Sequence, residues 1–255
     1  MEDGTPPALR LDTVTRRFGG VVAVDGMSLR LERGERVSVI GPNGAGKTTL
    51  FRLIAGELRP TSGRIELLGR DVTGMPPQRR ARLGLARTFQ VSNLFVGLTV
   101  AENVRLASQA DDRGQWRFWG PISSTDRASA AARDVLERVG LTHRSADRVS
   151  SLSHGEQRQL EVAMALVTEP SILLLDEPAA GLATKERAIL RGLLEELPRT
   201  LPLLLIEHDM SLALGLADRV LCMHNGRSIA LGLPDEVRRD KAVQSVYLGR
   251  GAEVA

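Results

Sequence analysis

Hydrophobic and polar positions alternate along the first part of the chain, from Ala8 to about Ile65. The segments LRLDTV, MSLRLE and RIELLG carry apolar residues at every second position, and turn segments such as Gly-Gly and RGER separate them. Because successive side chains of a strand point to opposite faces, a period of two predicts strands with one buried face. The pattern therefore predicts antiparallel strands in this region.

Three further segments are short and apolar almost throughout: RVSVI, SILLLDEP and LPLLLIE. Such runs are typical of strands that are buried on both faces of a parallel sheet. From about Val91 to Leu160 the spacing is helical, since Thr99 and Glu102 form a capping box ahead of AENVRLA and a second helical run ends at Gly140. The remainder returns to alternating strands and helices. The sequence thus predicts an α/β fold with a mostly parallel core sheet, an antiparallel β region and an inserted helical region.

The composition is that of an ordinary globular protein. With 255 residues, of which 42% are hydrophobic, the chain can bury one large domain or a domain with an inserted subdomain. No segment has the roughly 20 consecutive apolar residues of a membrane-spanning helix, and the segment MEDGTPPALR lacks the features of a secretion signal. Cys222 is the single cysteine, so no internal disulfide is possible. We expect a location in the cytosol or at its membrane face.

The charged residues give information on a nucleic-acid partner and on the positions of the few lysines. The formal net charge is only +3 and acidic residues are interleaved along the chain, which argues against a nucleic-acid partner. Arginine supplies 31 of the 34 basic residues, and the three lysines are Lys47, Lys185 and Lys241. In a chain with this preference, a lysine indicates a position that needs a compact ammonium group rather than a broad guanidinium.

Lys47 belongs to the segment GPNGAGKTT, which directly follows the predicted strand RVSVI. In a P-loop, glycines allow backbone N–H groups to face phosphate oxygens, and the next helix adds the positive end of its dipole. A simple glycine-rich turn before a helix is the alternative. The P-loop interpretation predicts a P-loop NTPase (RecA-like) fold that binds ATP and Mg²⁺, with Lys47 on the β- and γ-phosphates and Thr48 as a magnesium ligand. The predicted phosphate-binding residues are Gly41, Pro42, Asn43, Gly44, Ala45, Gly46, Lys47, Thr48 and Thr49.

Polar side chains follow the other two apolar strands. Asp176 and Glu177 end SILLLDEP, and His208 comes just after LPLLLIE. The carboxyl ends of parallel strands share one edge of a sheet, where α/β proteins bind ligands. We expect Asp176 to hold Mg²⁺ through its water shell, Glu177 to polarise the attacking water, and His208 to reach the γ-phosphate. Taken singly, a strand ending in Asp-Glu-Pro can be only a turn, and such a histidine only a surface residue.

Two more segments carry candidate site residues. Gln90, in ARTFQ, has an amide that can coordinate Mg²⁺ and hydrogen-bond the attacking water. In LSHGEQRQLEVAMAL, Ser153 and Glu156 form a capping box that predicts a helix start. With Ser153 and Gly155 exposed, this helix start is also an anion site, suited to a phosphate supplied from outside the subunit.

A P-loop, a glutamine loop, LSHGEQ, LLLDEP and a histidine loop occur in this order over nearly the entire chain, which resembles the ATPase subunits of ABC transporters. In that family two ATPase subunits, identical or homologous, pair head to tail. The resemblance implies that Ser153, His154, Gly155 and Glu156 contact the ATP held by the P-loop of the partner, and that Phe18 stacks on adenine. It also implies integral membrane permease subunits as partners, an extracytoplasmic solute-binding protein as an indirect partner, and a peripheral position at the cytoplasmic face of the membrane.

Finer features resemble the subunits of branched-chain amino acid importers: ARTFQ, LFVGLTVAENV, HGEQRQLE, PAAGL, IEHDM and VYLG. Importers of urea, other amides or aromatic acids share much of this pattern, so the solute remains open. A lipid exporter ATPase, or a non-transport ABC ATPase that acts on a macromolecule, is the alternative. Ala183 departs from the family, which more often has Asp or Asn there.

The resemblance implies one ABC ATPase domain over residues 8–250. Within it we expect a nucleotide-binding core with the antiparallel β region over 8–90, a helical subdomain with the LSHGEQ segment over 91–160, and completion of the core over 161–250. Trp116 and Trp119 lie in an interrupted stretch, which we interpret as a loop packed by its own aromatic residues in preference to a partner contact.

Overall fold

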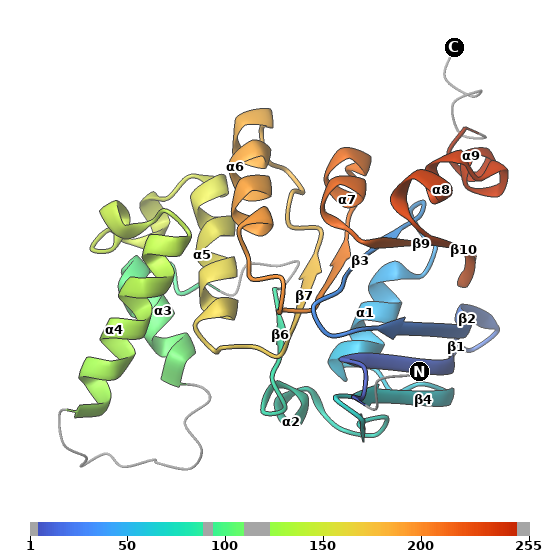
Figure 1. Ribbon diagram of the computed structural model, residues 1–255. Helices are drawn as coiled ribbons and strands as arrows, with labels where there is room; N and C mark the ends of the chain where they lie inside the picture. Colours follow the sequence, from blue (N-terminus) through green and yellow to red (C-terminus); the bar gives the residue numbers. More distant parts are fainter. Residues whose placement is uncertain (1–4, 89–93, 110–122, 249–255) are drawn as a thin grey trace. The chain divides into compact units, whose positions relative to one another are not determined.

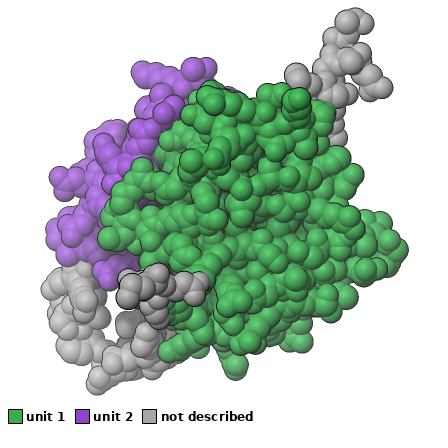
Figure 2. Space-filling model, turned by 45° about the vertical axis from the view of Figure 1, so that its right-hand side comes forward, with its two compact units in different colours: residues 1–85, 171–177, 198–255 green, residues 86–170, 178–197 purple. Residues whose placement is uncertain are grey.

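The computed structural model describes residues 5–88, 94–109 and 123–248, and these residues form two compact units. The first unit comprises residues 1–85, 171–177 and 198–255, and the second comprises residues 86–170 and 178–197 (Figure 2). The stretch with both tryptophans and the residue Gln90 lie outside the described residues.

The predicted antiparallel region is confirmed as a four-stranded sheet in the first unit, in the order β2-β1-β4-β5. Strand β1 pairs antiparallel with β2 and with β4, so Leu9 lies opposite both Leu31 and Leu67. These three leucines are buried, because one face of the sheet packs on the core. The bounds of the strands are β1 Leu9–Phe18, β2 Val21–Leu31, β4 Ser62–Leu67 and β5 Arg70–Asp71.

The mostly parallel core sheet is also confirmed, with six strands in the order β10-β9-β3-β8-β7-β6. Strand β3 runs parallel to β8 and β9, and β7 runs parallel to β8, whereas β10 joins β9 as an antiparallel edge. The central strands β3, β7 and β8 are buried at every residue, as their largely apolar sequences predict. The bounds are β3 Arg36–Ile40, β6 Leu85–Arg87, β7 Ile172–Asp176, β8 Leu203–Ile206, β9 Arg219–His224 and β10 Arg227–Gly232.

One buried apolar cluster contains residues of both sheets and of helix α1. This helix contacts strand β2 (Figure 1). Leu50, Phe51, Leu53 and Ile54 of this helix are all fully buried in the cluster. The helix therefore fixes the position of the loop that precedes it. The helices of the first unit are α1 Lys47–Ala55, α2 Pro77–Ala81, α7 Met210–Leu216, α8 Pro234–Arg239 and α9 Lys241–Leu248.

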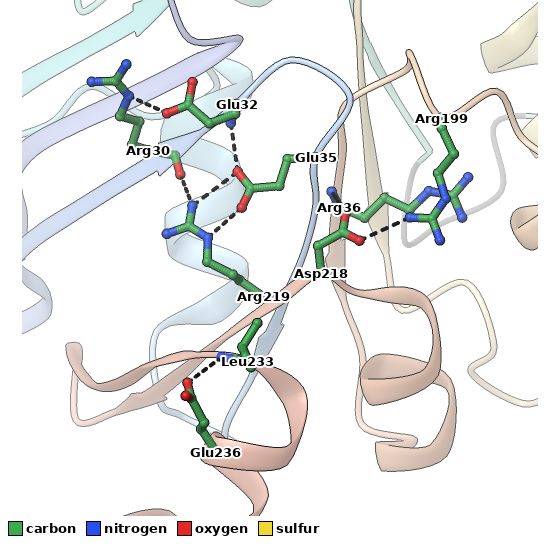
Figure 3. Close-up of polar contacts among 9 residues, drawn as sticks. All are labelled: Arg30, Glu32, Glu35, Arg36, Arg199, Asp218, Arg219, Leu233 and Glu236. Carbon is green, nitrogen blue, oxygen red and sulfur yellow. Dashed lines mark hydrogen bonds and ion pairs between the residues drawn. The ribbon is translucent and has the colours of Figure 1, made fainter. Parts of the chain in front are cut away.

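A polar network holds the amino ends of β3 and β9 together (Figure 3). The Arg219 guanidinium forms a two-pronged ion pair with Glu35, and it also donates to the Arg30 carbonyl at 2.6 Å. The Asp218 carboxylate accepts the Arg36 N–H at 2.9 Å and an Arg199 N–H at 3.1 Å. Bidentate pairs of this kind restrict both partners. The network therefore anchors the sheet at the end opposite to the loop that follows β3.

The second unit contains the predicted helices. Its elements are α3 Val100–Gln109, α4 Ser123–Arg138, the short 3₁₀ turns η1 Thr142–Arg144 and η2 Val149–Ser151, α5 His154–Leu166 and α6 Thr184–Glu195. The predicted capping box ahead of α3 is confirmed, because the Glu102 carboxylate accepts the Thr99 N–H at 2.8 Å and the Thr99 hydroxyl accepts the Glu102 N–H at 3.2 Å. Among the described residues, no helix has the length and apolar character to cross a bilayer.

Candidate active site

The loop between β3 and α1, residues 41–46, is tightly packed at its two ends, Gly41 and Gly46. Gly46 precedes α1 with φ 101° and ψ 2°. A Cβ at this position would lie 2.3 Å from the Ala23 carbonyl oxygen of β2, so a side chain does not fit there. Asn43 and Gly44, at the tip of the loop, are exposed. A glycine-rich loop directly before a helix start is the type of segment that binds phosphate groups in proteins, because glycines let backbone N–H groups approach the anion and the helix start favours negative charge.

Lys47, the first residue of α1, is only 5% exposed and folds back over the same loop. Its ammonium donates to the Gly41 carbonyl at 2.6 Å and to the Pro42 carbonyl at 3.0 Å. Burial lowers the pKa of Lys47, and the charges of Glu177 and Asp176 oppose this shift. Because β3, β8 and β7 are neighbouring parallel strands, Lys47 lies at the same edge of the sheet as Asp176 and Glu177.

The two carboxylates stand at the end of β7, as predicted. Asp176 is the last residue of the strand and is fully buried. Glu177 follows it with φ 49°, a left-handed conformation that is uncommon for a residue other than glycine. The Glu177 N–H donates to the Ile206 carbonyl at 2.9 Å, which ties this unusual turn to the neighbouring strand β8. The sequence did not predict this local strain. Such conformations cluster at functional sites, and Glu177 is one of five described non-glycine residues with a positive φ.

His208 reaches the same edge of the sheet from β8. Its Nε2 lies 2.6 Å from Oε1 of Glu177, and the side chains of His208 and Glu177 are 42% and 16% exposed. Glu207 is buried, and its carboxylate accepts the N–H groups of His208 at 3.0 Å and Asp209 at 3.3 Å. Glu207 was missed as a candidate, although an acidic residue directly after a buried apolar strand is a signal that could have found it. The first unit therefore brings Lys47, Asp176, Glu177 and His208 to one place.

The donor set at this edge suits a magnesium ion that is shared with a phosphate. Mg²⁺ prefers oxygen ligands and usually keeps several waters, with only one or two protein ligands and the remainder from substrate phosphates. The Asp176 carboxylate and the half-buried Thr48 hydroxyl are ligands of this kind. Within the described parts of the chain, no cluster of three or more His, Cys, Asp or Glu residues could hold a metal alone. These residues fit a metal ion that arrives with a nucleotide.

Phe18, the last residue of β1, is 43% exposed and does not belong to the core. The guanidinium of Arg16 lies 4.5 Å from the centre of its ring. An exposed ring is available for stacking on a planar base. The adenine contact of Phe18 stays a prediction.

The LSHGEQ segment begins α5 in the second unit, and its predicted capping box is confirmed. Glu156 accepts the Ser153 N–H at 2.8 Å, and the Ser153 hydroxyl accepts the Glu156 N–H at 3.2 Å. Ser153 and His154 are exposed. The expectation that Gly155 is also exposed was wrong: Gly155 is buried, and its N–H donates to Oε1 of Glu186 at 3.1 Å. The sequence could not show this contact, because Glu186 lies 31 positions further along the chain.

Comparisons with known proteins identify the family. Residues 24–180 match the family model described as "ABC transporter", and residues 227–253 match the model described as "Branched-chain amino acid ATP-binding cassette transporter". The chain is 43% identical over 251 residues to the high-affinity branched-chain amino acid transport ATP-binding protein LivG of Salmonella typhimurium, covering 95% of this chain and 98% of the relative. It is 39% identical to BraF of Pseudomonas aeruginosa, which carries the same description, over 95% and 98% of the two chains.

A solved structure agrees with these relatives. The crystal structure of an ATP-binding cassette of an ABC transporter in its ADP conformation matches with a TM-score of 0.83 and 29% identity, over 96% of this chain and 100% of that chain. The predicted P-loop NTPase class is therefore confirmed. Family model, relatives and fold lead to the same conclusion: the chain belongs to the ABC transporter family of ATP-binding proteins.

Proposed function

We propose that this chain is the ATP-hydrolysing subunit of an ABC importer for branched-chain amino acids or a related small solute. The names of LivG and BraF support this solute class, and so does the separate match of residues 227–253 to the branched-chain amino acid model. The single observation that carries the catalytic part is the 2.6 Å contact between Glu177 and His208, next to a P-loop lysine.

In this proposal the loop 41–49 binds the ATP phosphates, and Lys47 contacts the β- and γ-phosphates. Asp176 and Thr48 would hold Mg²⁺, which would neutralise charge on the phosphates. Glu177 polarises the water that attacks the γ-phosphate, and His208 positions Glu177 and contacts the same phosphate. Gln90, which lies outside the described residues, would add a magnesium ligand and a hydrogen bond to the attacking water.

The trans half of the ATP site comes from a second ATPase subunit. Ser153, His154, Gly155 and Glu156 of one subunit would face the ATP held by the P-loop of the other, because a helix start favours anions. ATP binding would close the pair and hydrolysis would reopen it. Permease subunits in the membrane would receive this motion, and an extracytoplasmic solute-binding protein would deliver the solute. We place the subunit at the cytoplasmic face of the membrane.

The domain organisation is part of the proposal. Residues 8–250 would act as one ABC ATPase domain, with the LSHGEQ segment in its helical part. The division at residues 90 and 160 differs from the compact units, since residues 178–197, with α6, group with the helical unit. Helix α5 contacts α6 within that unit, which links the LSHGEQ helix to the segment that follows Glu177 in sequence.

The substitution Glu177→Gln tests the catalytic assignment. It removes the carboxylate that polarises water and leaves the loop 41–49 unchanged, so we expect retained ATP binding, an ATP-dependent dimer that no longer dissociates, and turnover lower by about 10²–10⁴-fold. Steady-state phosphate release, nucleotide titration and size-exclusion chromatography measure these three properties.

Glu196→Gln is the matched control, because it makes the same chemical change at an exposed position at the end of α6. The control should hydrolyse ATP like the unmodified protein. Wild-type turnover in Glu177→Gln would remove Glu177 from its role.

A further inference from the structure

Glu186 makes two hydrogen bonds to backbone N–H groups from different parts of the second unit. Its Oε1 accepts the N–H of Gly155, the second residue of α5, at 3.1 Å. Its Oε2 accepts the N–H of Ala183, the residue before α6, at 3.0 Å. Ala183 has no polar side chain to cap this helix. A single half-buried carboxylate therefore joins the starts of α5 and α6.

The side chain of Glu186 lies directly against Gly155. A Cβ built on Gly155 would lie 2.8 Å from Glu186 Oε1 and 2.9 Å from its Cδ and Cγ, so the carboxylate occupies the space next to this glycine. A Cβ built on Gly181 would similarly lie 3.2 Å from Cε1 of His154. Two neighbouring residues of the LSHGEQ segment thus contact the segment 181–186, which follows the catalytic strand in sequence.

An N–H group has one proton, and at Gly155 this proton already points to a carboxylate oxygen. Any other anion that uses the same N–H must share it or replace Glu186. The two anions would also repel each other at short distance, in a partly buried place where solvent screening is weak. In the single subunit, Glu186 supplies the negative charge that stabilises the start of a helix.

We propose that Glu186 is a positioning residue that sets the affinity of the LSHGEQ segment for the terminal phosphate of the ATP held by the partner subunit, by competing for the Gly155 N–H. This inference rests on the proposed function, in which that phosphate meets α5. The phosphate must turn Glu186 away from Gly155. Because the same carboxylate caps Ala183, its release also loosens the first turn of α6. Occupation of the trans site is thereby transmitted to the segment after Glu177.

The substitution Glu186→Gln distinguishes two roles of Glu186. In the first, Glu186 competes with the phosphate for the Gly155 N–H, and in the second it only stabilises the fold. Glutamine at the third position of a helix is compatible with a capping box, as glutamate is. A glutamine side chain has only one acceptor oxygen, however, and carries no charge. The N–H groups of Gly155 and Ala183 therefore lose the negative charge and one of their two acceptor oxygens, which weakens the competition at Gly155.

The experiment uses the full-length chain in the Glu177→Gln background, where ATP is not turned over, and measures the ATP concentration at half-maximal dimerisation. Adding Glu186→Gln should lower this concentration about fivefold or more, at the lower end of the usual range for coupling between two sites. Adding Glu196→Gln, the matched control at an exposed position, should leave it unchanged. ATP binding measured at protein concentrations too low for dimerisation should be the same in all three variants, since it depends on the loop 41–49.

A competing role and a structural role for Glu186 predict opposite results. A purely structural role predicts a higher ATP requirement for dimerisation and a lower unfolding midpoint in urea. An unchanged or raised ATP requirement would overturn the competing role of Glu186 and leave the proposed function intact. Absence of any ATP-dependent dimer in the Glu177→Gln parent would overturn both.

Discussion

The substitution Gly46→Ala tests how closely the phosphate-binding loop is fitted to its surroundings. An alanine would have to adopt φ near 101°, which costs about 1–2 kcal/mol for a residue with a Cβ. The new methyl would lie 2.3 Å from the Ala23 carbonyl oxygen, so the two must separate by about 0.7 Å to reach the 3.0 Å that real contacts require. Overpacking of this kind costs about 1–3 kcal/mol. We therefore expect a total loss of about 2–5 kcal/mol.

Gly44→Ala is the matched control in the same loop. Gly44 also has a positive φ, 82°, but a Cβ there would meet nothing within 4 Å. Only the conformational cost of about 1–2 kcal/mol applies. The difference between the two variants isolates the conflict with β2, about 1–3 kcal/mol, which corresponds to a factor of about 5–150 in an equilibrium constant.

The predicted loss of free energy is the sum of two measured changes, one in the dissociation constant for ATP and one in the free energy of unfolding. If the loop moves away from β2, nucleotide binding must push it back, and the dissociation constant for ATP rises. If the loop stays in place, the strain lowers the free energy of unfolding in urea instead. The sum of the two losses is the predicted quantity. Equal sums for Gly46→Ala and Gly44→Ala, or a larger sum for Gly44→Ala, would refute the close approach of this loop to β2.

Three further predictions concern separate parts of the chain. Lys47→Ala should weaken nucleotide binding itself, because it removes the buried ammonium over the loop; an unchanged affinity in a titration would contradict the P-loop assignment. Ser153→Arg should leave ATP binding by the single subunit normal and abolish dimer-dependent hydrolysis, and full hydrolytic activity would exclude the trans site. Tyr247 is the only tyrosine, so its tyrosinate absorbance reports one group. Burial raises the pKa of Tyr247 from 10.0 to about 12, so the unfolded chain loses this proton first and stability should fall as the pH rises from 10 to 12. A tyrosine pKa near 10 in the folded protein would contradict the partial burial of this ring.

Features that depend on neighbouring residues in sequence could be predicted. The short, largely apolar segment of β3, followed by the glycine-rich loop, predicted a strand, a turn and a helix. The capping boxes at Thr99 and Ser153 specified the starts of α3 and α5. Because β7 and β8 are both parallel strands of one sheet, the sequence also predicted that Glu177 and His208 meet, and their 2.6 Å contact agrees with this.

Features that depend on distant residues could not be predicted. The left-handed conformation of Glu177 has no local cause, since it is maintained by the hydrogen bond to Ile206 of a different strand. The burial of Gly155 depends on Glu186, and hydropathy patterns give no information about such a pairing. The grouping of α6 with the helical unit likewise follows from packing and not from the order of segments along the chain.

The conformation of Glu177 also bears on which half of the proposed ATP site is formed within one subunit. A left-handed glutamate is unfavourable by about 1–2 kcal/mol, and it persists only where the surroundings fix it. Here both the backbone, through Ile206, and the side chain, through His208, are held by residues of the same unit. The conformation of Glu177 is therefore a property of the paired strands β7 and β8 and needs no second subunit. The Gly155 N–H, in contrast, is already committed to Glu186. On the proposed function, a single subunit thus has a prepared catalytic half and an occupied trans half, so the energy of ATP binding is required for pairing and not for assembling the catalytic residues.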